Sequence, residues 1–340
     1  MEHSLYFMDI RSTDPTYNLA LEEYLLTHHT EGEILLLWQN ANTVVIGRNQ
    51  NTEEEINRPF VEEHQITVVR RTTGGGAVYH DLGNLNYSFI QDVGDPETIS
   101  IAALAVPVVR ALEEMGVHAE LSGRNDILVD GKKISGVAQR MFRNRILHHG
   151  TLLFDSDPEM VAGALQVRQD KFQSKSAKSV RTRIGNIREF LPDSTVTVED
   201  FRRRLIEALT ASREVRPICL TAEEEREIRT LQEEKYRNWD WNFGKSPAYA
   251  FHNGARFPGG RVEISANVEQ GIIREIRFTG DFLALTEVSQ AEKALTGVRF
   301  ERQLFAHDRQ PVAEVLAALP LQALFGSVTA EEILQLLFEI

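Results

Sequence analysis

One short stretch, from Arg70 to Asn84, combines two adjacent arginines, three consecutive glycines and a His-Asp pair. Three glycines after a predicted strand cost backbone entropy, so something in the folded chain must need the missing side chains. One interpretation is that backbone N–H groups approach the phosphate or carboxylate of a ligand, with Arg70 and Arg71 supplying positive charge. The alternative is a tight turn with a hydroxyl-rich loop. The arginines before the glycines and the His80-Asp81 pair after them favour a ligand-binding loop.

A second stretch, from Gly123 to Arg140, places two lysines beside a predicted hairpin turn at Asp130-Gly131. Gly136 stands inside the following strand pattern, which indicates either a bulge or a ligand lying against the backbone. Strict alternation groups Lys133 with the odd-numbered residues after it, so Arg140 shares a pocket with Lys133 only if a bulge intervenes. Solubility at the tip of the hairpin is the alternative role of the two lysines.

Two adjacent histidines, His148 and His149, occur in a third stretch with a strand pattern. Neighbouring side chains on a strand point to opposite faces, so this pair cannot ligate one metal ion without distortion. A single inward histidine is more often a hydrogen-bonded core residue than a ligand group. The basic segment from Lys178 to Asn186 also leaves two roles open, a solvated loop or a local positive cluster in an acidic chain.

The composition is that of a globular protein and excludes several classes of function. Of 340 residues, 42% are hydrophobic and 26% are charged, and the formal net charge is −13. Binding to nucleic-acid phosphates needs a cationic surface, so no nucleic-acid partner is expected. The single cysteine, Cys219, excludes a disulfide within one chain and cysteine-based zinc sites. No membrane partner and a cytosolic location are expected, because the sequence has no signal-peptide pattern and no apolar run of membrane-spanning length.

Hydrophobic periodicity predicts a scaffold of strands and helices for these stretches. Asp14-Pro15 begins a helix that ends near His28. Helical spacing recurs from Ile101 to Leu112, where Pro107 predicts a kink or a division into two helices. Arg143-Asn144-Arg145 predicts a second hairpin turn. The strand patterns cover residues 34–38, 43–47, 66–70, 85–90, 127–129, 134–140 and 146–154.

Beyond residue 156, helices and polar loops are predicted, followed by a separate module. Thr221 to Lys235 is expected to form a charged, mostly solvated helix, and Trp239 to Pro247 a linker. Residues 260–268 and 272–278 are expected to pair as strands, with closing helices over 289–295 and 330–338. These patterns predict a large domain over residues 1–246 and a small α+β domain over residues 251–340.

Taken together, the stretches resemble the lipoate–protein ligase family. The family's signature, Arg-Arg-x-Ser/Thr-Gly-Gly-Gly-x-Val-x-His-Asp-x-Gly-Asn, is matched by Arg70 to Asn84 with threonine at the Ser/Thr position. The resemblance covers essentially the whole chain, including the C-terminal module of the longer bacterial forms. The further motifs, in the family's order, are Gly-Arg-Asn-Asp at 123–126, Lys-x-Ser-Gly at 133–136, His-His-Gly-Thr-Leu at 148–152, Ser-Val-Arg-x-Arg at 179–183 and Trp-x-Trp-Asn-Phe-Gly at 239–244.

The resemblance implies an α+β fold and a two-step reaction. The implied fold has a mixed, largely antiparallel sheet flanked by helices, as in the biotin/lipoate ligases and class II synthetases, plus the small C-terminal domain. In the implied reaction, lipoate and ATP give lipoyl-AMP and pyrophosphate, and the lipoyl group then passes to a lysine of an acceptor protein. The implied acceptors are lipoyl domains of 2-oxoacid dehydrogenase E2 subunits and the glycine cleavage H protein.

By position in the motifs, the resemblance also implies roles for individual residues. Lys133 would be the catalytic residue and would contact both the lipoyl carboxylate and the α-phosphate, whose charges a cationic pocket must offset. Asp126 would place Mg²⁺ on the phosphates, since Mg²⁺ prefers oxygen ligands and keeps several waters. The implied ATP-binding residues are Arg71, Gly76, Ala77, Val78, Tyr79 and Lys133, and the implied lipoate-binding residues are Arg70, Gly75, Lys133, Arg140 and His149.

An octanoyl- or lipoyl-transferase of the same fold is the alternative function. Enzymes of that kind move an acyl group between carrier proteins through a cysteine thioester and without ATP. The thiol needs a lowered pKa in an accessible, electropositive setting. Cys219 is far in sequence from all four stretches and is expected to be structural. A non-enzymatic binding module or biotin-dependent repressor lacks support, because no N-terminal DNA-reading segment is recognised and the net charge is negative.

Overall fold

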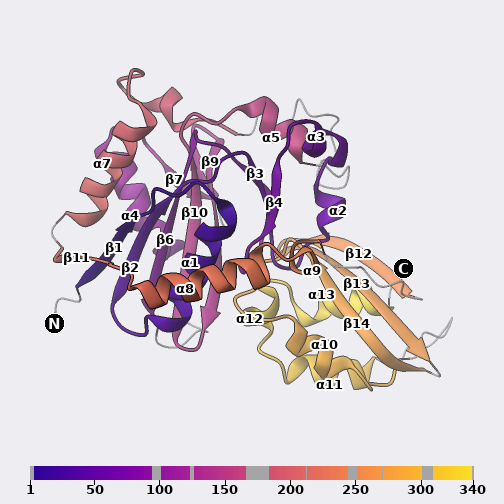
Figure 1. The fold of residues 1–340 in the computed structure, drawn as a ribbon. Coiled ribbons are helices and arrows are strands. Elements are labelled where there is room, and N and C mark those ends of the chain that lie inside the picture. The colour runs from indigo at the N-terminus through magenta and orange to yellow at the C-terminus, as the bar shows by residue number, and fades with distance from the viewer. Residues whose placement is uncertain are drawn as a thin grey trace.

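A large mixed sheet runs through the N-terminal two thirds of the molecule (Figure 1). The computed structural model describes residues 4–93, 101–122, 126–165, 184–211, 213–243, 251–269, 271–300 and 309–338. Within these ranges the sheet has eight strands in the order β11-β1-β2-β6-β10-β9-β8-β7. The strands are β1 (Leu5–Asp9), β2 (Glu33–Trp38), β6 (Asn84–Asp92), β7 (Glu120–Ser122), β8 (Asp126–Val129), β9 (Lys132–Phe142), β10 (Arg145–Leu153) and β11 (Val215–Pro217).

Most neighbours in this sheet are antiparallel. Only β1 is paired in parallel in the described part of the sheet, with β2 on one side and β11 on the other. The predicted hairpin turns are present, between β8 and β9 at Asp130-Gly131 and between β9 and β10 at Arg143-Asn144. Asp130, Gly131 and Arg143 have positive φ angles of 48°, 75° and 54°. The predicted fold class, a mixed and largely antiparallel sheet flanked by helices, is confirmed.

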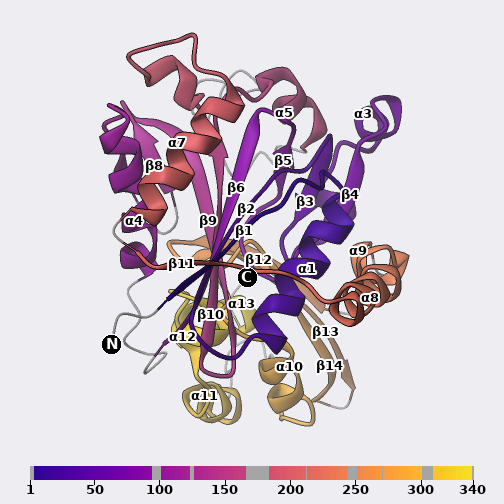
Figure 2. The ribbon, with the colours of Figure 1, turned by 60° about the vertical axis from the view of Figure 1, so that its left-hand side comes forward.

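Helices cover both faces of the large sheet (Figure 2). On one face, α4 (Ile101–Glu114) and α7 (Val198–Thr210) pack against the side chains of Leu35 and Leu37. On the other, α1 (Pro15–His28) packs against Leu36 and Trp38 and is covered in turn by α8 (Ala222–Leu231) and a π-helical turn (Gln232–Tyr236). Burial on both faces explains why β2 is an uninterrupted apolar run.

The predicted helices of this domain are present. Of the two alternatives predicted at Pro107, the division into two helices is excluded, because α4 continues through this residue as one element. The charged helix after Thr221 is mostly exposed, as predicted, with Ile228 and, just beyond its predicted end, Tyr236 buried against α1. The helix at Asp14-Pro15 is as predicted, and the Asp14 carboxylate accepts a hydrogen bond from the Thr16 backbone N–H at 2.9 Å.

A small sheet beside the large one carries the arginine–glycine loop. Its strands in the described chain are β4 (Thr67–Arg70), β3 (Thr43–Ile46) and β5 (Val78–His80), in that order. The loop of residues 71–77 joins β4 to β5, so both of its ends are anchored to β3. The short helices around this sheet are α2 (Thr52–Glu55), α3 (Arg58–Glu63), α5 (Pro158–Ala164) and a 3-10 helix (Ile187–Phe190).

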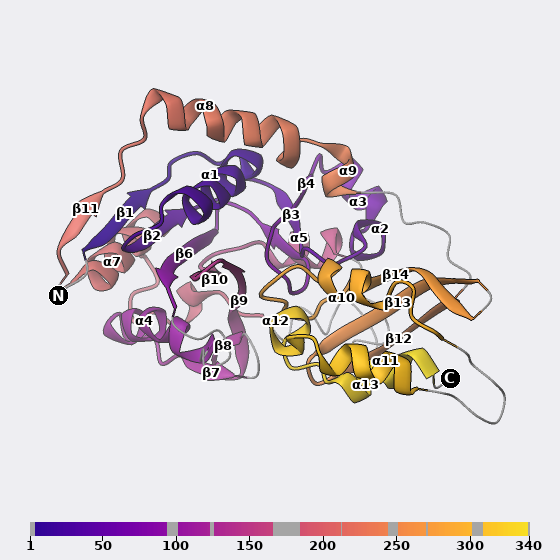
Figure 3. The same cartoon turned by 90° about the horizontal axis from the view of Figure 1, so that it is seen from below.

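The C-terminal part has its own three-stranded sheet and its own hydrophobic core, and lies beside the large sheet (Figure 3). The predicted strand pair and closing helices are present as β13 (Gly260–Glu269), β14 (Ile272–Gly280), α10 (Ser289–Leu295) and α13 (Ala330–Phe338). The sequence patterns did not predict β12 (Phe251–Phe257), α11 (Gln310–Ala317) and α12 (Leu321–Phe325). None of the described helices is long and apolar enough to cross a bilayer.

The predicted linker is partly wrong. Its first residues form α9 (Trp239–Asn242), which packs against β4, and residues 244–250 lie outside the described chain. Asn242 Oδ1 accepts a hydrogen bond from the Arg70 backbone N–H at 2.8 Å, and the Trp241 indole donates to Arg70 O at 2.9 Å. Two side chains therefore satisfy backbone groups of β4, which a spacing pattern does not reveal.

Candidate active site

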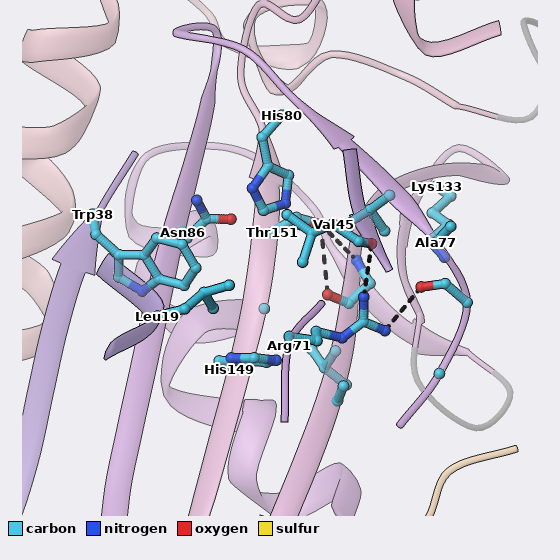
Figure 4. A pocket seen from close by; sticks show the side chains of 17 residues that line it. Leu19, Trp38, Val45, Arg71, Ala77, His80, Asn86, Lys133, His149 and Thr151 are labelled. Carbon is cyan, nitrogen blue, oxygen red and sulfur yellow. Dashed lines mark hydrogen bonds between the residues drawn. The ribbon is translucent and has the colours of Figure 1, made fainter. Parts of the chain in front are cut away.

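A cavity of about 110 Å³ lies between the small sheet and β6, β9 and β10 of the large sheet (Figure 4). Part of its wall is cationic, with Arg71 and Lys133, and part is apolar, with Leu19, Trp38 and Val45. The cavity is lined by Leu19, Trp38, Val45, Arg71, Gly75, Gly76, Ala77, Val78, His80, Asn86, Lys133, Gly136, Val137, Ala138, His149, Gly150 and Thr151.

Arg71 shapes the glycine loop at one side of this cavity. Its guanidinium is buried and donates hydrogen bonds to Gly74 O at 2.6 Å and to Gly76 O at 2.8 Å, and a further one to Val45 O at 3.1 Å. Burial lowers the pKa of Arg71 to about 10, so the side chain keeps its charge at neutral pH. The loop therefore has a fixed shape with a positive charge beneath it.

The three glycines of the loop serve different purposes. A Cβ on Gly74 would lie 2.7 Å from the carbonyl oxygen of Phe282, so the loop touches the C-terminal part of the chain there. Gly75 has φ +86°, which side chains disfavour, and its N–H donates to Phe282 O at 3.3 Å. A Cβ on Gly76 would meet nothing within 4 Å. Two glycines therefore allow close packing of the loop, and the third leaves open space at the cavity wall, while ligand binding by the loop stays a prediction.

Lys133 reaches the cavity because of a bulge. Ile127 pairs with Ser135 while Leu128 pairs with Lys133, so β9 carries one extra residue at Ile134. The bulge changes the strict alternation and lets the Lys133 side chain lie across Gly136, where a Cβ would be 3.0 Å from Nζ. The glycine in this strand pattern thus makes room for a side chain of the same strand.

The ammonium of Lys133 lies 2.7 Å from Asp126 Oδ1. Asp126 is not part of the cavity lining but stands next to it through this ion pair. The neighbouring Lys132 points elsewhere and donates to Glu189 Oε2 at 2.8 Å on the surface. The two lysines are therefore separated as the alternation of a strand requires, and only Lys133 faces the cavity.

His149 lines the cavity and is held at both ring nitrogens. Nδ1 lies 2.9 Å from Glu22 Oε1, and Nε2 lies 2.8 Å from Thr73 Oγ1. Arg71 Nε donates to the same Thr73 hydroxyl at 2.9 Å, so we assign the Thr73 proton to His149 Nε2 and the imidazole proton to Nδ1. Glu22 is a residue that the sequence analysis missed. A glutamate among the apolar residues of a predicted helix could have indicated a buried polar contact.

Besides Asp126, three of the expected site residues lie outside the cavity lining. The Arg70 guanidinium is buried and donates to the carbonyl oxygens of Gly47 at 3.0 Å and Gln50 at 2.6 Å, and to Trp241 O at 2.8 Å. Arg140 Nη1 donates to Glu23 Oε1 at 2.8 Å. The third is Tyr79, whose hydroxyl donates to Asn42 Oδ1 at 2.9 Å.

Glu23 is the centre of a buried cluster that holds Arg140 away from the cavity. Its carboxylate accepts hydrogen bonds from Lys235 Nζ and the Tyr236 hydroxyl, each at 2.7 Å. Burial raises the pKa of Glu23, but the charges and hydrogen bonds of Lys235 and Arg140 outweigh it and lower the pKa below its usual value. Glu23 therefore stays ionised and fixes the cationic side chains around it.

The described residues contain no group of three or more acidic, histidine or cysteine side chains that could hold a metal ion by themselves. A nucleotide-bound Mg²⁺ does not need such a group, because phosphates and waters supply most of its ligands. Cys219 is exposed and does not line the cavity. The thiol is therefore not placed where a nucleophile for this cavity would be.

The chain matches two protein-family models and several curated proteins. Residues 14–210 match the model of the lipoyl protein ligase A/B catalytic domain, and residues 246–337 match that of the bacterial lipoate protein ligase C-terminus. The chain is 44% identical over 340 residues to lipoate-protein ligase LplJ of Bacillus subtilis, which covers 98% of this chain and 100% of that protein. It is 41% identical over 326 residues to lipoate–protein ligase 1 of Staphylococcus aureus, which covers 96% of this chain and 97% of that protein.

Solved structures of lipoate-ligase proteins have the same fold as this chain. The Plasmodium falciparum protein LipL1 in complex with lipoate superposes with a TM-score of 0.76 at 25% identity, over 93% of this chain and 94% of that one. A lipoate-protein ligase A bound with ATP superposes with a TM-score of 0.60 at 29% identity, over 72% of this chain and 100% of that one. A bi-partite ligase from Thermoplasma acidophilum, studied with its E2 lipoyl domain, superposes with a TM-score of 0.62 at 30% identity, over 74% of this chain and 100% of that one.

Proposed function

This chain belongs to the lipoate–protein ligase family, and we propose that it activates lipoate with ATP and transfers the lipoyl group to a lysine of an acceptor protein. One observation carries this proposal: a single cavity joins a cationic, glycine-lined side to an apolar wall. The cationic side suits a carboxylate and a triphosphate, and the apolar wall suits a medium-length acyl chain.

In the first step, a carboxylate oxygen of lipoate bonds to the α-phosphorus of ATP, and the bond from that phosphorus to the bridging oxygen of pyrophosphate breaks. The two reactants are both anions, so the step needs a cation between them. Lys133 is the catalytic residue, because its ammonium is at the cavity wall and lies over Gly136 without a side chain in the way. Its ion pair with Asp126 holds the ammonium before the reactants arrive.

The nucleotide lies on the loop from Gly76 to Tyr79, with the bare backbone at Gly76 as the point of closest approach. Ala77 and Val78 line the cavity, while Tyr79 contributes through its backbone in β5. Arg71 supplies charge and loop shape, since its hydrogen bonds go to carbonyl oxygens of the loop. Asp126 is the residue that would hold Mg²⁺ with the phosphates, and Mg²⁺ would neutralise the leaving pyrophosphate there.

Lipoate occupies the apolar wall, with His149 and Gly75 among its neighbours. Arg70 and Arg140 lie outside the cavity lining and position the elements that form it. Arg70 holds the turn that follows β3 against α9, and Arg140 is fixed by Glu23. Their contribution is the position of the loop and of β9, because their guanidinium groups are bonded to the protein itself.

In the second step, the amine of an acceptor lysine attacks the acyl carbon of lipoyl-AMP, and the bond from that carbon to the AMP phosphate oxygen breaks. The acceptors are lipoyl domains of E2 subunits and the glycine cleavage H protein, in the cytosol, where ATP is available. The chain has a net charge of −13, so long-range repulsion slows its association with any acceptor that also carries a net negative charge. We therefore expect the transfer rate at limiting acceptor to rise as moderate salt is added. A rate that falls steeply with salt would contradict this.

The catalytic domain spans residues 1–246 and the accessory domain residues 251–340. This division is supported by the two family matches, over residues 14–210 and 246–337, and by the separate hydrophobic core of the C-terminal part. The described contacts between them include the hydrogen bond from Gly280 N to Asn49 O at 2.7 Å and the ion pair of Arg48 with Glu287.

An ATP–pyrophosphate exchange assay with lipoate, octanoate and biotin tests the proposal. We expect exchange that depends on lipoate and no exchange with biotin. Modification of an acceptor from octanoyl-carrier protein without ATP would overturn the proposal in favour of the transferase. That alternative is disfavoured by the family relatives and by the position of Cys219, which is exposed and outside the cavity lining.

A further inference from the structure

Polar side chains converge on the apolar wall of the cavity, away from Lys133. Trp38 pairs across the β2–β6 ladder with Asn86, and the Trp38 and His80 rings are 6.2 Å apart. Asn86 and His80 line the cavity, and Figure 4 shows Asn86 beside Trp38 on the side opposite Lys133. Both are almost fully buried, with 1% of Asn86 and 3% of His80 exposed.

The hydrogen-bond network behind His80 determines its tautomer. Asn18 Nδ2 donates to Gln39 O at 2.8 Å and to Asn40 Oδ1 at 3.0 Å. The Asn40 oxygen is therefore the acceptor, and its Nδ2 is left to donate to His80 Nδ1 at 3.2 Å. The imidazole proton consequently sits on Nε2. Burial lowers the pKa of His80 to about 3, so the ring is neutral.

The Nε2–H of His80 has no hydrogen-bond partner among the described residues. Asn86 presents a second such group: we assign Asn84 Nδ2 as the donor to Asn86 Oδ1 at 2.9 Å, which leaves Asn86 Nδ2 without a partner in the described chain. Buried polar groups are nearly always paired, and unpaired ones call for a partner that the protein alone does not supply. The wall therefore offers two N–H donors next to apolar side chains.

We propose that His80 and Asn86 are specificity-determining residues that donate hydrogen bonds to sulfur atoms at the far end of the acyl substrate. This inference rests on the proposed function. With the carboxylate at Lys133, the chain of lipoate runs along the apolar wall and places its five-membered disulfide ring at the opposite end. Disulfide sulfurs are weak acceptors, whereas the end of a simple alkyl chain accepts nothing. A site built to donate to a substrate atom discriminates against an analogue that lacks the atom.

The test compares lipoate with its carbocyclic isostere, 5-cyclopentylpentanoate, and with octanoate. The isostere keeps the ring and the chain length but replaces both sulfurs with CH₂ groups. The measured quantity is the ratio of kcat/KM values for lipoate and isostere in ATP–pyrophosphate exchange. We expect the wild type to prefer lipoate about tenfold and the Asn86→Leu variant to lose most of that preference, since the net contribution of one hydrogen bond is of this order and sulfur is a weak acceptor. A ratio has the advantage that a partly unfolded sample does not change it.

Two further variants sharpen the result. His80→Gln keeps an N–H near the position of Nε2 and is expected to retain the preference, whereas His80→Leu is expected to lose it. Val137→Ala is the matched control, because it alters an apolar part of the wall and should lower both kcat/KM values with little change in their ratio. If Asn86→Leu does not fold, Asn86→Ala serves in its place.

Failure of the inference and failure of the proposed function have different signatures. A wild type that shows no lipoate-dependent exchange would overturn the proposed function and this inference with it. A wild type that uses lipoate and its isostere equally well would overturn the inference alone. So would an Asn86→Leu variant whose preference for lipoate is unchanged, since an ordered water would then be the partner of the two donors.

Discussion

Three pairs of identical neighbours, Arg70-Arg71, Lys132-Lys133 and His148-His149, divide between the cavity and the rest of the protein. In each pair the second residue lines the cavity and the first does not. Lys132 pairs with Glu189 at the surface, Arg70 binds backbone carbonyl groups beside α9, and His148 is buried next to Gln139. The two residues of each pair are of the same type. The direction of the side chain from its strand or loop therefore decides whether it lines the cavity or contributes to stability.

The lysine pair gives the largest expected effect. Lys133→Ala should fold normally and lose about a hundred- to thousandfold in the rate of pyrophosphate release, the usual loss when one preorganised electrostatic contact to a transition state is removed. Lys132→Ala is the matched control and should be nearly silent, since an exposed ion pair contributes little. Equal effects of the two substitutions would show that the cavity is not where the reaction occurs.

The arginine pair separates binding from stability. Arg71→Lys cannot bridge Gly74 O and Gly76 O and should lower kcat/KM for ATP at least about tenfold. Arg70→Lys should instead lower the free energy of unfolding by about 2–4 kcal/mol, because several buried carbonyl groups lose their donor. Urea unfolding and the two KM values distinguish the outcomes. A large rise in the KM for lipoate in Arg70→Lys would place Arg70 in contact with the substrate.

His148, the histidine of the pair that does not line the cavity, is expected to make the free energy of unfolding fall at acid pH. Burial lowers the pKa of His148 to about 3 from 6.5, so the unfolded chain binds a proton that the folded chain does not. The stabilisation is complete above pH 6.5 and is lost as the pH falls towards 3. At pH 5 this single group should cost about 2 kcal/mol relative to pH 7. Unfolding of His148→Gln at both pH values should show a correspondingly smaller loss, and an unchanged loss would contradict the assignment.

Cys219, which belongs to none of the three pairs, gives the smallest expected effect. Cys219→Ser should leave pyrophosphate exchange and transfer to an acceptor unchanged, because the thiol is exposed and does not line the cavity. Transfer measured with and without ATP checks this. Loss of transfer in a folded Cys219→Ser protein would favour a thioester mechanism and would remove the reason for treating Lys133 as the catalytic residue.

The ordered motifs, the strand alternation and the turn residues were readable from the sequence because each depends on neighbours along the chain. The Asp14-Pro15 helix start and the Asp130-Gly131 turn are of this kind, since a side chain or a positive φ specifies them within a few residues. The helix α9 was misjudged, because its partner β4 is distant in the chain. The strand β12 was missed although its partner β13 follows it directly, because Asn253-Gly254 interrupts its apolar pattern.

The sequence by itself determined which residues are available for chemistry, and that an acidic chain with one cysteine carries an arginine–glycine loop and a lysine hairpin. Tertiary structure alone decided which of them meet. Lys133 reaches the cavity because of a one-residue bulge in β9. The Arg70 guanidinium donates to Trp241 O in α9, and Glu22 of α1 contacts the His149 ring. The physical reason is that local patterns specify the direction of a side chain within its own element, whereas contacts between elements depend on packing across the whole molecule.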